Sequence, residues 1–80
     1  MEDGNVLERI SLLAAEEHRI FEREGRDKAT DADRRRLKEI EVTLDQCWDL
    51  LHQRRARRAA GQDPDDSTIR DPRTVEGYLP

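Results

Sequence analysis

Few residues of this 80-residue chain have the types and spacing that enzyme or metal chemistry requires. The two histidines, His18 and His52, lie in different halves of the sequence, and Cys47 is the single cysteine. No Cys-x-x-Cys, His-x-x-x-His or Glu-x-x-His pair occurs, so no short motif supplies two metal ligands. We therefore expect no enzymatic activity, no catalytic or cofactor-binding residues and no metal site within one chain, although two copies could still assemble a metal site.

A basic segment that contains four arginines spans residues 53–58. It could contact the phosphates of a nucleic acid. However, no aromatic residue interleaves with it to stack on bases, and the net charge of −4 gives no general attraction to nucleic acid. Acids follow immediately and can fold back on it. Local ion pairs are therefore the favoured interpretation and nucleic-acid binding the alternative for Arg54, Arg55, Arg57 and Arg58, with Asp63, Asp65 and Asp66 as the acids.

Two segments carry apolar residues at helical spacing. The first is predicted to span about residues 5–24, with Asn5 as its cap and Gly25 as its left-handed end. The second is predicted over 31–60, after a cap at Thr30 and before Gly61. A helix of about 30 residues would be roughly 45 Å long, so these two helices dominate the fold, which we predict to be all-α.

The two apolar stripes match as the sides of an antiparallel hairpin, because a short polar loop joins them. Facing residues then have numbers that add to 57, and Cys47 acts as a small apolar residue of the seam. The pattern is broken where Glu17 would face Ile40; either the acid extends outward to solvent, or it marks a polar binding spot. The pairs are Val6 with Leu51, Ile10 with Cys47, Leu13 with Leu44, and Ile20 with Leu37.

Residues 61–80 form a tail with Asp-Pro turn signals. Its apolar residues (Ile69, Val75, Tyr78 and Leu79) are spaced too irregularly for a helix. The tail is either disordered or extended along the hairpin of residues 1–60, and we favour docking. Two helices alone bury little apolar surface, so we expect a homodimer that forms a coiled-coil-like four-helix bundle. Trp48, beside the seam, is either ordinary core or a contact for a partner.

Localisation follows from composition. No apolar run is long enough to span a membrane. The residues after Met1 are acidic where a signal peptide would be basic. Together with a lone cysteine, these features predict a cytoplasmic protein that does not bind membranes.

Several segments together resemble a small bacterial family known as domain of unknown function 2630. The resemblance covers nearly the whole chain, and its most specific part is the Cys-Trp-Asp segment followed by the arginine run. It implies a short stand-alone cytoplasmic protein, and it implies no activity. The segments are Glu16-Glu17-His18, Leu44–Leu51, Gln53–Arg58, Gly61–Pro64 and Val75–Leu79.

The favoured function is thus a protein–protein interaction or structural module with an unknown protein partner. The alternative is a small nucleic-acid-associated regulator. The candidate interaction residues are Trp48, Arg54, Arg55, Arg57, Arg58, Tyr78 and Leu79.

Overall fold

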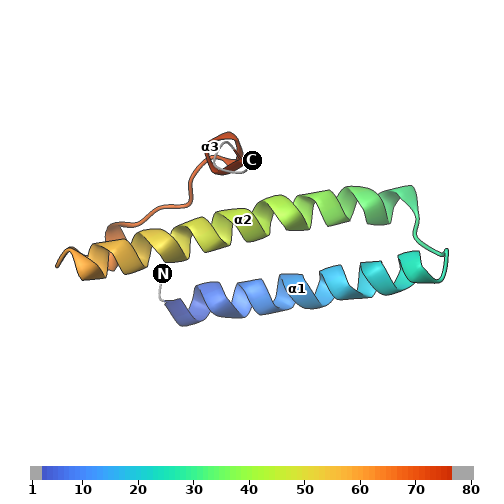
Figure 1. Ribbon diagram of the computed structural model, residues 1–80, viewed down its shortest axis with the longest axis horizontal. Helices are drawn as coiled ribbons and strands as arrows, with labels where there is room; N and C mark the ends of the chain where they lie inside the picture. Colours follow the sequence, from blue (N-terminus) through green and yellow to red (C-terminus); the bar gives the residue numbers. More distant parts are fainter. Residues whose placement is uncertain (1–2, 77–80) are drawn as a thin grey trace.

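The computed structural model describes residues 3–76, which form two long helices packed side by side and a tail that returns along one of them (Figure 1). The long helices are α1 (Asp3–Gly25) and α2 (Asp31–Ala59). The tail contains a 3-10 turn, η1 (Pro64–Asp66), and a short helix, α3 (Pro72–Glu76). The prediction of an all-α fold is confirmed. Within the described part of the chain, no helix is long and apolar enough to cross a membrane.

α2 begins at the predicted cap, Thr30. The Thr30 hydroxyl accepts a hydrogen bond from the Asp33 amide (3.1 Å), and the Asp33 carboxylate accepts one from the Thr30 amide (3.1 Å). This reciprocal capping box satisfies amides that have no partner inside the helix. The same carboxylate receives Arg23 of α1 at 2.8 Å, so the start of α2 is also tied to the end of α1.

Both long helices end in the same way, with a left-handed residue just past the last turn. After α2 this residue is Gly61 (φ 72°), as predicted. After α1 it is Asp27 (φ 58°), whereas Gly25 is still helical, so the prediction of Gly25 as the left-handed residue is wrong. The amide of Lys28 bonds to the Arg23 carbonyl (2.8 Å), which closes the turn around Asp27. Aspartate tolerates this conformation better than most residues.

The two glycines should therefore respond oppositely to alanine. A Cβ added at either position would have no other atom within 4 Å, so the effect of each substitution on stability depends on the backbone conformation alone. We expect Gly25→Ala to stabilise the protein by about 0.5–1 kcal/mol, because alanine restricts the unfolded chain at a helical position. Gly61→Ala should destabilise it by about 1 kcal/mol, because its φ is positive. Urea unfolding of both variants tests this, and a loss of stability in Gly25→Ala would contradict it.

The prediction of a helix cap at Asn5 is wrong, because α1 already includes Asp3. The start of α1, two residues earlier than predicted, coincides with a tertiary contact. The Asp3 carboxylate is held by Arg54 and Arg58 of α2, so the first residues of the helix are anchored rather than frayed.

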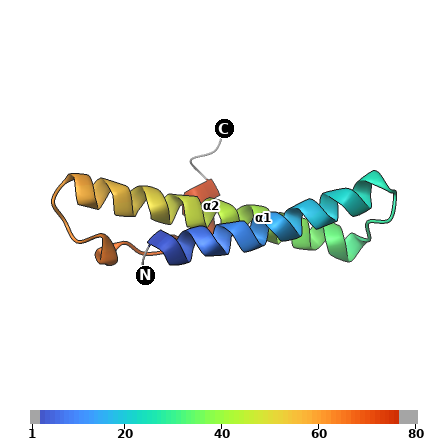
Figure 2. The ribbon, with the colours of Figure 1, turned by 90° about the horizontal axis from the view of Figure 1, so that it is seen from below.

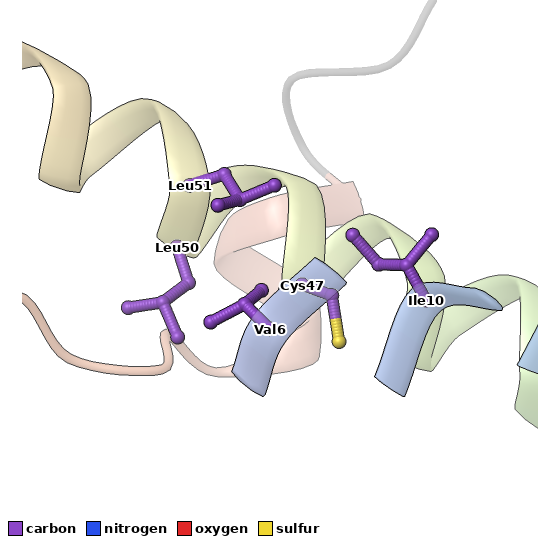
Figure 3. Close-up of a cluster of buried hydrophobic side chains, with 5 residues drawn as sticks. All are labelled: Val6, Ile10, Cys47, Leu50 and Leu51. Atoms are coloured by element: carbon purple, nitrogen blue, oxygen red, sulfur yellow. The ribbon is translucent and has the colours of Figure 1, made fainter. Parts of the chain in front are cut away.

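The seam between α1 and α2 contains one buried cluster near the N-terminal end of α1 (Figure 3). Its members come from both helices, and Val6 and Ile10 of α1 lie against the α2 side chains. Two predicted pairs, Val6 with Leu51 and Ile10 with Cys47, therefore meet in one cluster. The full set is Val6, Ile10, Cys47, Leu50 and Leu51, with Leu44 packed against it.

Nearer the loop, Ile20 and Ile40 are also buried. Glu17, which breaks the apolar pattern, is half-buried, yet Ile40 opposite it is completely buried. The acid at position 17 thus does not open the seam. The neighbouring Glu16 receives Arg36 of α2 at 2.6 Å and links the helices along one side.

The described tail is not simply extended, and the prediction that it contains no helix is wrong. Each Asp-Pro pair starts a short helical turn, with proline at its first position. Asp63 accepts from the Asp65 amide (2.9 Å) at the start of η1, and Asp71 accepts from the Arg73 amide (2.7 Å) at the start of α3. Both turns pack on α2, and Figures 1 and 2 show the tail running back along that helix.

Candidate interaction surfaces

Arg54 forms a buried junction between three parts of the chain. Its side chain is only 6% exposed. Its Nε donates to Asp3 at the start of α1, and its Nη1 donates to the Asp65 carboxylate (3.0 Å) and the Pro64 carbonyl (3.3 Å) of η1. Arg58, one turn further along α2, donates to Asp3 at 2.6 Å. The junction therefore ties the first turn of α1 and the tail to the same place on α2.

The junction also controls the ionisation of its groups. Hydrogen bonds from Arg58 and Arg54 lower the pKa of Asp3 from its ordinary 3.8 to about 2. In return, the hydrogen bond to Asp3 raises the pKa of Arg54. The charges are thus fixed at any physiological pH, and this contact is structural rather than a titrating switch.

The arginine run is accordingly divided. Arg54 and Arg58 are engaged by Asp3, and one of the acids after the run, Asp65, folds back on Arg54 as the ion-pair interpretation predicted. Arg55 is exposed and Arg57 is half-buried, and neither takes part in the junction, so these two members of the run remain candidates for an external ligand. The sequence interpretation missed Asp3, although a signal was present: its number and that of Arg54 also add to 57.

A second surface is apolar and faces solvent. Leu7, Ala14 and Phe21 recur every seven residues along α1 and so share one side of it. Leu7 is 44% and Phe21 46% exposed. On α2, Trp48 is 43% exposed, and Leu37 and Leu44 are half-buried on the same side of this helix. We call these six residues the open face: Leu7, Ala14 and Phe21 with Leu37, Leu44 and Trp48.

Both halves of the open face lie on the same side of the hairpin. Residues on a helix are rotated by about 100° from one to the next. In an antiparallel pair this rotation places the two sets on one side of the seam, and the Glu16–Arg36 ion pair on the other. Trp48 then falls near the level of Leu7, Leu44 near Ala14, and Leu37 near Phe21. Within residues 3–76, three apolar layers thus continue outward from the buried seam without a cover.

The residues considered for chemistry are not brought together. Cys47 is buried, and the loss of solvent raises the pKa of its thiol. His18 is exposed and contacts Glu22 at 3.2 Å, one turn along its own helix, while His52 is exposed on α2. Among residues 3–76 no three His, Cys, Asp or Glu side chains are grouped to hold a metal ion. Tyr78 and Leu79 lie outside the described residues.

The tail is held by a third surface, a line of polar side chains on α2 that we call the tail-binding flank (Gln46, Asp49 and Gln53). Gln53 Nε2 donates to the Thr68 carbonyl at 2.7 Å, and Gln46 Nε2 donates to the Arg70 carbonyl at 3.0 Å. Asp49 lies 3.5 Å from the Arg70 guanidinium. Sequence reasoning expected docking but did not identify these residues, because glutamines on a helix are ordinarily solvated.

Comparison with known proteins agrees with the resemblance. The family model described as "Protein of unknown function (DUF2630)" matches residues 2–80. Uncharacterized protein Rv0898c of Mycobacterium tuberculosis is 40% identical over 77 residues, which cover 95% of this chain and 88% of that protein. Uncharacterized protein Mb0922c of Mycobacterium bovis matches to the same extent. No solved structure matches. The match over nearly the whole chain, with the Cys-Trp-Asp segment and the arginine run inside it, makes this protein a member of the DUF2630 family.

Proposed function

We propose that this protein is a helical protein–protein interaction module that works as a homodimer, in which the open faces of two hairpins pack together into a four-helix bundle. The observation that carries the proposal is the open face itself. A single hairpin leaves Leu7 and Trp48 more than two-fifths exposed in one layer of the open face, and Phe21 equally exposed two layers along. Contiguous apolar surface of this kind marks an interaction site in a small protein.

The size of the open face suits a second copy of the chain. α1 has 23 residues, so it is ~35 Å long, and two helices side by side are ~20 Å wide. The resulting ~700 Å² per copy is close to the roughly 800 Å² that each partner buries in a specific interface. The heptad spacing along α2 also suits the shallow crossing angles of a bundle.

The spacing on α1 is self-complementary about Ala14. A two-fold axis at that residue would set Leu7 of one copy against Phe21 of the other, and Ala14 against Ala14. Two-fold interfaces require one surface to complement itself in this way. The small alanine at the crossing point would allow the two α1 helices to approach closely, because the side chains at a contact set the interaxial distance.

Phe21→Glu tests the proposal by placing a charge within the open face. We expect wild-type protein at tens of micromolar to have the mass of a dimer by light scattering. We expect Phe21→Glu to weaken the dimer at least tenfold, because each interface would desolvate two unpaired carboxylates. Helicity should persist, because Phe21 is outside the buried seam cluster.

Leu12→Glu is the matched control. Leu12 is on the same helix and is 66% exposed, but it lies on the side of α1 away from the open face. That variant should remain dimeric. A monomeric wild-type protein, or a Phe21→Glu variant that dimerises as well as wild type, would refute the homodimer.

The alternative of a nucleic-acid-associated regulator draws less support from the contacts. Arg54 and Arg58 already form ion pairs with Asp3, and Arg54 forms another with Asp65, which leaves Arg55 and Arg57 for phosphates. Two such arginines per chain would supply few of the phosphate contacts on which salt-dependent binding rests.

A cytoplasmic location remains our proposal, and it is supported by the single free Cys47, which suits a reducing compartment.

A further inference from the structure

The tail-binding flank recognises the main chain of the tail more than its side chains. The Gln53 side-chain amide donates to the Thr68 carbonyl (2.7 Å) and accepts from the Thr68 amide (3.4 Å). A neighbouring β-strand would satisfy an extended residue with the same pair of bonds. Gln46 adds a bond to the Arg70 carbonyl. Contacts of this kind fit any segment that lies extended across α2.

Two contacts add side-chain selectivity. Asp49 lies 3.5 Å from the Arg70 guanidinium, and the Gln53 amide donates to the same Asp49 oxygen at 2.9 Å. Five residues beyond Arg70, Val75 is buried where α3 packs on α2. In contrast, Ile69 is 47% exposed. The flank and the neighbouring surface of α2 therefore select a segment that is extended at an arginine and, five residues later, presents an aliphatic residue from a short helix.

The part of the tail beyond the Arg54 junction is lightly attached. Within residues 67–76, Val75 is the buried apolar side chain, and the hydrogen bonds to Gln53 and Gln46 are polar contacts at or near the surface. Segments with few buried apolar contacts open locally without unfolding the rest of the protein. The seam of the hairpin does not include any tail residue. Release of the tail would thus expose the flank and leave α1 and α2 packed.

We propose that the tail-binding flank is a docking site for a segment of a partner protein that carries this arginine–aliphatic pattern, extended at the arginine and helical at the aliphatic residue, and that residues 67–76 occupy the site as an internal competitor. A partner binds by displacing the tail, so the tail sets the threshold for binding. This site is separate from the open face, because Gln46, Asp49 and Gln53 lie on the flank of α2 that the tail covers.

The test uses full-length protein in which the tail is released in two independent ways. Val75→Asp removes the buried apolar contact, and Thr68→Pro removes the backbone N–H that donates a hydrogen bond to the Gln53 side chain. Neither change alters the flank. The probe is a fluorescein-labelled peptide of residues 62–76 with the native sequence, and binding is measured by fluorescence anisotropy. Far-ultraviolet circular dichroism verifies that the long helices persist.

We expect both release variants to bind the probe saturably, and wild-type protein to bind at least tenfold more weakly, because its own tail occupies the site. A probe with Arg70→Ala should bind about fivefold more weakly, as expected for loss of a partly exposed ion pair. A probe with Ile69→Ala should bind like the native peptide. Adding Gln46→Ala and Gln53→Ala to the release variants should abolish binding.

The proposal is overturned if neither release variant binds the probe, if wild-type protein binds it equally well, or if the glutamine substitutions leave the affinity unchanged. Adding Phe21→Glu to Val75→Asp keeps this test separate from the homodimer. Probe binding should survive that change, so failure of the dimer would leave the docking site standing, and the reverse also holds.

Discussion

Leu51→Ala is expected to lower the free energy of unfolding by about 2–5 kcal/mol, the range for removing a buried leucine from a packed core. Leu51 is completely buried in the seam, where Val6 and Ile10 of α1 meet α2. A chain of this size rarely gains more than about 3–5 kcal/mol from its core. We therefore expect much of the variant to be unfolded at room temperature, as measured by urea titration with circular dichroism at a fixed protein concentration.

Leu12→Ala is the control for this prediction. Leu12 is also a leucine on a long helix, but it is 66% exposed and has no place in the buried cluster. Its replacement should change stability by less than about 0.5 kcal/mol. If Leu12→Ala and Leu51→Ala had equal effects, the seam would not be where the stability of the hairpin resides.

Arg54→Glu should be the most damaging change within the arginine run. It would place a carboxylate between Asp3 and Asp65, where the structure holds a buried guanidinium. We expect the melting temperature to fall several times further than in Arg55→Glu, whose side chain is exposed. Amide hydrogen exchange should also show loss of protection in residues 64–76, because the junction anchors η1. Equal effects of the two substitutions would contradict the junction.

The free energy of unfolding measured at acidic pH gives a second test of the same junction. The pKa of Asp3 is about 2 in the folded protein and ordinarily 3.8. A carboxylate whose folded pKa is lowered stabilises the protein above its unfolded pKa, and this contribution disappears as the pH falls from about 4 toward 2. Arg54→Glu should flatten this part of the profile. It should not abolish it, because Arg58 remains beside Asp3 and because Arg23 and Thr30 independently lower the pKa of Asp33 to about 2.

The overall helical architecture could be predicted because its signals are local or periodic. The heptad spacing of apolar residues indicates which sides of two helices face each other, and the antiparallel connection then predicts which residues share a layer. The cap at Thr30 and the end of α2 before Gly61 depend on a few adjacent residues, so residue type was enough to place them. The exposed Phe21 and Trp48 follow from the same periodicity, because they flank the seam instead of occupying it.

The contacts that join distant parts of the chain depended on the tertiary structure. Asp3 and Arg54 are 51 residues apart, and only the packed hairpin brings them together. That contact starts α1 earlier than its local cap signal indicated and buries an arginine that composition places at the surface. The docking of the tail also depended on the tertiary structure. Gln46 and Gln53 bind the main chain of the tail, and a main chain carries no sequence pattern that would identify these two glutamines. Periodic apolar residues thus specified the hairpin from the sequence alone, whereas polar contacts between remote residues required the folded chain, because their energy depends on a geometry that no local pattern encodes.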